Sequence, residues 1–183
     1  MNQKRNIKFL EKKEIEQIIN AIPAEGLKNR RDRALISLLF STGLRISEAL
    51  ALKRNDLAKD PSQTLELSII GKMGYQRTVY VSPEALRVIL RYFAGRRDND
   101  ERVFPIGIRA VQLMVKRRAK EAGMEKWITP HKFRHSLATD LLRQGVDIRY
   151  VQEFLGHKSL NNTMVYTHCV NDDLRKIHEK IYK

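Results

Sequence analysis

Two histidines and an arginine lie within five residues of one another in the segment "TPHKFRHSLATDLL" (129–142). Pro130 favours a helix that begins here, because proline is common at the first helical position. On such a helix His131 and Arg134 are three residues apart and point in the same direction. The helix start adds N–H groups and the positive end of the helix dipole. The segment therefore predicts an anion site that contains an acid–base group.

A metal site is the alternative, because His131 and His135 have the spacing of two zinc ligands on one helix. Arg134 would repel a cation, however, and the chain has a single cysteine, Cys169, to offer as a further ligand. His135 is followed by apolar residues, which favours a buried, hydrogen-bonded histidine over a ligand. We therefore expect anion binding, with no metal and no cofactor.

A second isolated charge lies in "STGLRISEAL" (41–50), where Arg45 follows a glycine turn and begins a short helix. A guanidinium so close to apolar residues needs a partner, because an unpaired buried charge is costly. Glu48, three residues further on, is one candidate, and a bound phosphate is another. The pattern alone leaves both open.

Three further polar residues are weak signals when each is taken alone. Lys72 lies in "GKMGYQR", at the tip of a predicted hairpin, where a lysine is commonly just solvated. His157 follows Gly156 in the connection between two predicted helices, and Tyr166 lies two turns into the second of them. A tyrosine in that position is ordinarily half-buried. None of the three predicts a function by itself.

The chain is strongly basic, with 35 Lys and Arg residues against 21 Asp and Glu residues and a formal net charge of +14. This excess favours a polyanionic partner, with nucleic acid ahead of a membrane surface. In the predicted helix 109–123, five basic residues precede the first acid, and a solvated helix face is one interpretation of such a run. The other is phosphate contact, for which the candidates are Arg109, Lys116, Arg117 and Lys120.

Hydrophobic periodicity predicts a mainly helical protein with one β-hairpin. Alternating apolar residues mark two strands, 64–70 and 77–81, joined by a glycine-containing turn. The length of 183 residues and the 42% hydrophobic content fit one domain over residues 1–183. We expect the α+β class, mainly α, with a small antiparallel sheet or hairpin. The predicted helices are 10–22, 31–43, 46–53, 82–95, 109–123, 131–143, 147–154, 159–167 and 171–182.

The sequence also bears on the cellular compartment. No segment approaches the roughly 18 consecutive apolar residues of a membrane span, and no apolar run of the kind found in a secretory signal follows the N-terminus. A single cysteine excludes an internal disulfide and fits a reducing compartment. We expect a cytoplasmic, nucleoid-associated protein with no membrane partner.

Taken in order, these segments resemble the tyrosine recombinases, or phage integrase family, and especially their Xer-like branch. The pattern comprises "TGLRISEAL", "GK" in a hairpin, "HKFRHSLAT", "LGH" and "YTH", and it covers the chain from Phe9 to Tyr166. The resemblance implies a helical catalytic domain that cleaves and rejoins DNA strands through a 3′-phosphotyrosyl intermediate on Tyr166. It implies a catalytic set, with Glu48 in support, that consists of Arg45, Lys72, His131, Arg134, His157 and Tyr166.

The chemistry of these residue types agrees with the roles that the resemblance implies. Two arginines would neutralise a phosphodiester as its pentacoordinate state forms, in place of metal ions. Tyr166 would attack phosphorus, and His131 is suited to accept the phenol proton. Lys72 would protonate the departing 5′-oxygen, and His157 would donate a hydrogen bond to the phosphate.

The resemblance further implies a double-stranded DNA recombination site as partner, a tetrameric synapse of identical chains on that DNA, and a monomer when free. Family members usually carry an N-terminal core-binding domain, which we do not expect here, because the pattern starts within about ten residues of Met1. Met73 stands where the family often has glycine. The predicted helix 171–182 would pack on its own domain or on a neighbouring protomer. A type IB topoisomerase-like enzyme and a non-catalytic DNA-binding protein are the alternatives.

Overall fold

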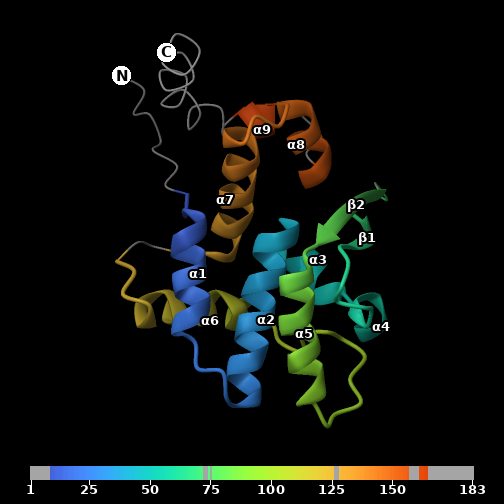
Figure 1. The fold of residues 1–183 in the computed structure, drawn as a ribbon, viewed down its shortest axis with the longest axis vertical. Helices are drawn as coiled ribbons and strands as arrows, with labels where there is room; N and C mark the ends of the chain where they lie inside the picture. The colour runs from blue at the N-terminus through green and yellow to red at the C-terminus, as the bar shows by residue number, and fades with distance from the viewer. Residues whose placement is uncertain (1–8, 72–73, 75, 126–127, 157–160, 165–183) are drawn as a thin grey trace.

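The computed structural model describes residues 9–71, 74, 76–125, 128–156 and 161–164. These residues form helices and one two-stranded antiparallel sheet (Figure 1), which confirms the expected α+β, mainly α, class. No helix within them is long and apolar enough to cross a membrane. The elements are α1 (Lys12–Ala21), α2 (Leu27–Thr42), α3 (Ile46–Ala51), α4 (Arg54–Leu57), β1 (Leu65–Ile70), β2 (Gln76–Val81), α5 (Pro83–Ala94), α6 (Ile108–Glu121), α7 (Pro130–Arg143), α8 (Ile148–Leu155) and α9 (Asn161–Met164).

Helix α2 is the central element, in contact with α1, α5, α7 and β2. It ends at Gly43, which adopts a left-handed conformation (φ 61°) that glycine enters without a Cβ penalty. Its sequence is apolar on nearly all sides beyond Asp32, as a buried helix requires. The interior of the protein is therefore built around α2, whose fully buried apolar residues include Ala34, Leu35, Ile36, Leu38 and Leu39.

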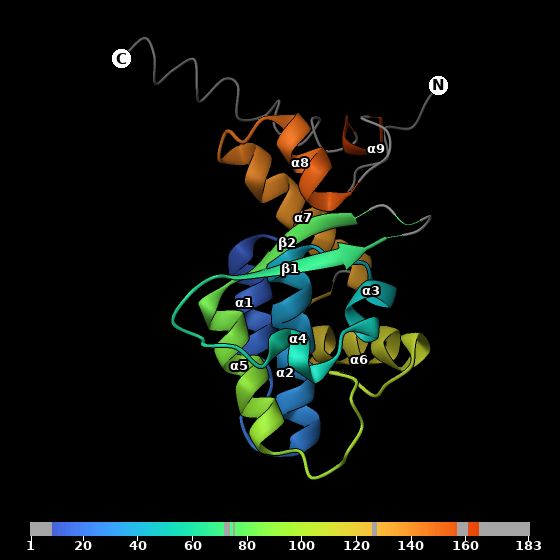
Figure 2. The same cartoon turned by 90° about the vertical axis from the view of Figure 1, so that its right-hand side faces the viewer.

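The hairpin lies between two groups of helices. Figure 2 shows β1 and β2 crossing the molecule with α7 and α8 on one side and α2 and α5 on the other. The register pairs Leu65 with Val81 and Ile70 with Gln76. Alternate residues of β2 face inward, and Arg77 is one of them, together with Val79 and Val81. The hairpin thus carries a cation into the protein interior.

Helix α7 is held by contacts with the main core, with α8 and with the residues that precede α1. Phe133 belongs to the main core, whereas Leu142 belongs to a second, smaller apolar cluster between α7 and α8. The backbone N–H of Leu10 donates to Ser136 Oγ at 2.8 Å, and Ser136 Oγ donates in turn to a carbonyl within α7. Arg143, in the last turn, pairs with Glu11 at 2.9 Å. Helix α7 is consequently fixed along its length.

The expected elements are confirmed wherever the structure describes them, with small shifts at their ends. Ser82 caps α5 by accepting from the N–H of Ala85, and Pro83 is its first residue. The four-residue helix α4 was missed, because it is too short to show a period. Within the predicted helix 159–167 the structure describes a helix over Asn161–Met164, and the predicted helix 171–182 lies outside the described residues.

An ion cluster that the sequence did not reveal joins α2 to α6. Asp32 is fully buried, and its Oδ2 accepts from Arg118 Nη2 at 2.8 Å and from Arg117 Nη2 at 3.1 Å. Arg31 pairs with the other carboxylate oxygen at 2.7 Å. Arg118 is itself buried, so it does not belong to the exposed basic run of this helix. A buried carboxylate of this kind is stable only while it remains paired.

Replacement of the buried arginine tests this cluster. Arg118→Met should lower the free energy of unfolding by about 2 kcal/mol, as expected for lost hydrogen bonds to a buried charge. Arg117→Met is the matched control, since its side chain is 42% exposed and should contribute less than about 1 kcal/mol. Urea denaturation measures both changes, and equal losses would show that burial of Arg118 is not what matters.

Candidate active site

Helix α7 begins as the sequence predicted, with Thr129 as N-cap and Pro130 in the first turn. It places Arg134 in the interior, where the side chain donates from Nη1 to the Gly43 carbonyl at 2.7 Å and from Nη2 to the Leu155 carbonyl. These carbonyls terminate α2 and α8. Carbonyl oxygens at helix ends carry partial negative charge, which suits a guanidinium. Arg134 is thus positioned by the ends of two other helices.

Arg45 is the N-cap residue of α3 and is paired with Glu48, one of the two partners that the sequence suggested for its guanidinium. Its Nη1 donates to Glu48 Oε1 at 3.0 Å, and its backbone N–H donates to Glu48 Oε2 at 2.8 Å. A longer bond of 3.4 Å joins Nη2 to the Gly156 carbonyl. The side chain remains 41% exposed, so the guanidinium is anchored on one side and accessible on the other.

Glu48 has a second cationic partner, Arg77 of β2, which sequence reasoning missed. Arg77 Nη1 and Nη2 donate to the two carboxylate oxygens at 3.0 and 2.8 Å. Burial would raise the pKa of Glu48, but hydrogen bonds from Arg77 and from the backbone of Arg45 outweigh it and lower that pKa to about 2. Glu48 is therefore ionised at neutral pH. The one available signal was an arginine at an inward position of an alternating strand.

His131, Arg134 and Arg45 come together although they are far apart in sequence. Both arginines donate to carbonyls at the end of α8, those of Leu155 and Gly156. The pKa of His131 is lowered, first by its partial burial and then by the charges of Arg134 and Arg45. A neutral imidazole next to two guanidiniums can accept a proton from a group that those guanidiniums bind. This arrangement has the chemistry to bind an anion beside a base.

His135 has a different character from His131. The two rings meet edge to face with centroids 4.4 Å apart, and His135 is half-buried. Burial first, and then the positive charges around it, lower the pKa of His135 to about 4. Among the described residues no group of three His, Cys, Asp or Glu side chains could hold a metal ion. With its pKa near 4, the His135 ring is neutral at neutral pH.

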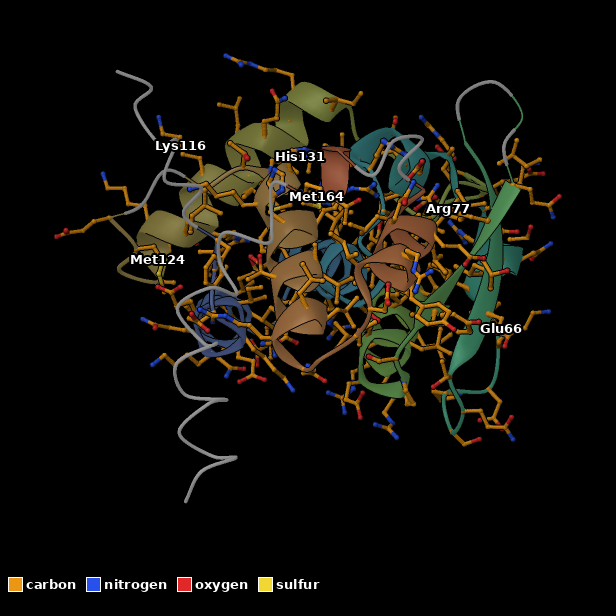
Figure 3. All side chains as sticks on the ribbon, turned by 90° about the horizontal axis from the view of Figure 1, so that it is seen from above. Glu66, Arg77, Lys116, Met124, His131 and Met164 are labelled. Carbon is orange, nitrogen blue, oxygen red and sulfur yellow. The ribbon has the colours of Figure 1, made fainter. Side chains whose placement is uncertain are left out.

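Three predicted catalytic residues, Lys72, His157 and Tyr166, lie outside the described residues. Gly156, which directly precedes His157 in sequence, lies beside Arg45, because its carbonyl accepts from Arg45 Nη2. Figure 3 labels His131 on α7 and Arg77 on β2, whose Nε donates to a carbonyl of α8. The residues of α6 that the sequence predicted to contact phosphate are all exposed: Arg109, Lys116, Arg117 and Lys120. Arg117 has acidic partners in Asp32 and Glu121.

The lowered pKa of His135 gives a pH dependence of stability. The unfolded chain binds this proton below the ordinary pKa of 6.5, whereas the folded protein binds it only near pH 4. Unfolding therefore takes up a proton in this window, and stability is full above pH 6.5 and is lost as pH falls towards 4. His135→Gln should flatten this slope in chemical denaturation between pH 6.5 and 4. The two proteins should have equal slopes between pH 7 and 8, and an unchanged slope below 6.5 would contradict the assignment.

Curated relatives match most of this chain. The tyrosine recombinase XerC of Leptospira interrogans is 38% identical over 168 residues, which are 87% of this chain and 53% of that protein. XerA of Thermococcus kodakarensis is 37% identical over 182 residues, 94% of this chain and 62% of that protein. The chain thus spans little more than half the length of these relatives.

Solved structures agree with the described fold. The crystal structure of a XerA recombinase superposes with a TM-score of 0.78 at 28% identity, over 96% of this chain and 65% of that one. A XerH recombinase bound to a palindromic difH substrate, in a post-cleavage complex, also gives 0.78, at 26% identity over 96% of this chain and 54% of that one. The sequence model of the phage integrase family matches residues 8–172. The chain belongs to the phage integrase family.

Proposed function

We propose that this chain is the catalytic domain of a tyrosine-type site-specific DNA recombinase. The observation that carries the proposal is the convergence of Arg45 and Arg134 at the end of α8, with the neutral base His131 beside them. Two guanidiniums with forked donors suit a tetrahedral phosphate, and a base suits the activation of a hydroxyl nucleophile. The tyrosine recombinases among the relatives, and the XerH structure with its DNA substrate, support this choice.

In the proposed reaction, Arg45 and Arg134 bind the non-bridging oxygens of one phosphodiester. The phenol oxygen of Tyr166 forms a bond to phosphorus while its proton passes to His131. The bond from phosphorus to the 5′-oxygen breaks, and Lys72 gives that oxygen a proton. His157 donates a hydrogen bond to the phosphate as charge develops on it. A 5′-hydroxyl from another strand then attacks the phosphotyrosine and releases Tyr166.

The proposal extends to the partners of the protein. Double-stranded DNA is the substrate, and four exposed basic residues of α6 would contact its phosphates. We also propose that residues 1–183 act as one catalytic domain, in the cytoplasm at the nucleoid, and that four copies assemble on paired DNA sites. The segment 171–182 would contribute to that assembly. The proposed α6 contacts are Arg109, Lys116, Arg117 and Lys120.

The nucleophile is tested by covalent attachment to DNA. Duplexes that the protein binds are selected from a random pool, nicked near the bound site and incubated with the protein, and the products are separated on a denaturing gel. Wild-type protein should give a covalent adduct that Tyr166→Phe does not give. Tyr150→Phe is the matched control, because this tyrosine is 70% exposed on α8 and should be dispensable. An adduct that persists in Tyr166→Phe would refute the assignment of the nucleophile.

The arginine clamp is tested in the same assay. Arg45→Ala should slow attachment by about 10²-fold or more, as expected when one donor to a developing oxyanion is removed. Arg149→Ala is the control, since its side chain is 81% exposed on α8 and pairs locally with Asp147. Excess EDTA should leave the wild-type rate unchanged, because guanidiniums supply the positive charge. Loss of cleavage in EDTA would instead indicate a metal-dependent site.

A further inference from the structure

Arg77 is a buried cation that the proposed reaction does not use directly. Its side chain is 2% exposed, and it forms a forked pair with Glu48 through Nη1 and Nη2. Its Nε donates to the Phe154 carbonyl at 3.3 Å, in the last turn of α8. Bidentate pairs of this kind fix orientation as well as distance. Arg77 consequently joins β2, α3 and α8 through one planar group.

The carboxylate of Glu48 accepts two hydrogen bonds from each of the two arginines. Oε1 accepts from Nη1 of Arg45 and from Nη1 of Arg77, each at 3.0 Å. Oε2 accepts from the backbone N–H of Arg45 and from Nη2 of Arg77, each at 2.8 Å. Two cations and one anion leave a net charge of one positive unit on this trio. Without Arg77, Arg45 and Glu48 would form a neutral pair.

This charge difference matters for an anionic ligand. A neutral ion pair attracts a phosphate far less than an unopposed guanidinium does, especially where water is partly excluded. Without Arg77, Glu48 would also lose its two hydrogen bonds from β2 and would be able to turn towards the accessible edge of Arg45. Removal of Arg77 therefore affects both the charge and the orientation of Arg45, although Nε, Nη1 and Nη2 of Arg77 are themselves already bonded to Phe154 and Glu48.

The end of α8 is shaped around the same guanidinium. A Cβ on Gly156 would lie 2.7 Å from Cδ of Arg77, closer than Cβ atoms come to other atoms in real structures, and 3.1 Å from its Nε, which is tighter than most such contacts. Gly156 adopts a left-handed conformation with φ 63°. The absence of a side chain at this position therefore makes room for Arg77, and the carbonyl of the same residue accepts from Arg45.

We propose that Arg77 is a positioning residue for strand cleavage, which neutralises Glu48 so that Arg45 presents its positive charge to the phosphate. This inference rests on the proposed function of Arg45. Arg77 acts through Glu48 and Arg45 and does not touch the DNA.

The experiment compares single-turnover rates of covalent attachment at saturating DNA. Arg77→Met should slow attachment by about 10-fold to 100-fold, less than the removal of a contacting donor itself. Arg118→Met is the matched control, because it also removes a buried arginine from a buried carboxylate, on the distant α2–α6 interface. Its rate should stay within about twofold of wild type. All variants are assayed below their melting temperatures, where each is folded, so equal losses in both would overturn the proposal.

A second variant separates charge balance from structural support. In Glu48→Gln/Arg77→Met, a neutral amide replaces the carboxylate that opposes Arg45, so the guanidinium of Arg45 again has a net charge of one positive unit. The double variant should therefore attach DNA at least about threefold faster than Arg77→Met alone, a non-additivity typical of coupled residues. A purely structural role for Arg77 predicts that the double variant is no faster, and that result would overturn the proposal.

The glycine gives a geometric test with its own control. Gly156→Ala adds a Cβ that displaces Arg77, whereas Gly145→Ala adds one at a comparable left-handed position with nothing within 4 Å. Both carry the backbone penalty of a positive φ, 63° and 86°. Gly156→Ala should slow attachment and Gly145→Ala should not. Similar rates in both variants would contradict the contact.

One readout does not depend on the proposed function. Carboxyl-carbon NMR follows the titration of Glu48, whose pKa of about 2 reflects hydrogen bonds from Arg77 and Arg45 that outweigh burial. This pKa should rise in Arg77→Met and stay in place in Arg118→Met, even for a protein that never attaches to DNA. Failure of wild-type attachment would refute the recombinase proposal, whereas an unmoved Glu48 titration would refute the role of Arg77.

Discussion

A single carboxylate, that of Glu48, connects the parts of the candidate site. Its side chain is 9% exposed, and an ionised carboxylate so far from water is stable only with several donors. Four hydrogen bonds supply them, two from Arg45 and two from Arg77. These bonds join the start of α3 to β2, and Arg77 continues the connection to α8. The hairpin, α3 and α8 therefore have one common anchor.

The ends of helices complete the arrangement. Arg134 spans the last carbonyls of α2 and α8, and Arg45 contacts the Gly156 carbonyl that follows α8. These groups hold the guanidiniums by partial charges, so their full positive charges are not cancelled. Glu48 does cancel the charge of one guanidinium, and the additional positive charge of Arg77 makes up for that loss. The site combines rigid placement of two arginines with a surplus of positive charge, which is what the binding of a phosphodiester requires.

Local signals in the sequence predicted most of the fold. The proline after Thr129 and the alternation of β2 each depend on neighbours in the chain, and both are confirmed. The pair of Arg45 and Glu48 was predictable for the same reason, because the two residues are one helical turn apart.

The contacts that sequence reasoning missed are long-range. Arg77 and Glu48 are 29 positions apart, and Arg118 and Asp32 are 86 apart. In each case a charged residue occupies an inward position of a strand or helix, which signals that a partner exists without identifying it. The run of bases on α6 looked uniform in sequence, yet only packing against α2 decides that Arg118 is buried while Arg117 is half-exposed. Three-dimensional neighbours, and not residue type, separate structural from ligand-binding cations here.

The central claim is that Arg45 and Arg134 bind one phosphate together. The most direct measurement is a crystal structure of the Tyr166→Phe variant with an intact duplex that carries its selected binding site. We predict that guanidinium nitrogens of both arginines lie within about 3.2 Å of oxygens of the same phosphate, while Glu48 remains bonded to Arg77. A structure in which that phosphate contacts neither arginine, or only one of them, would contradict the account.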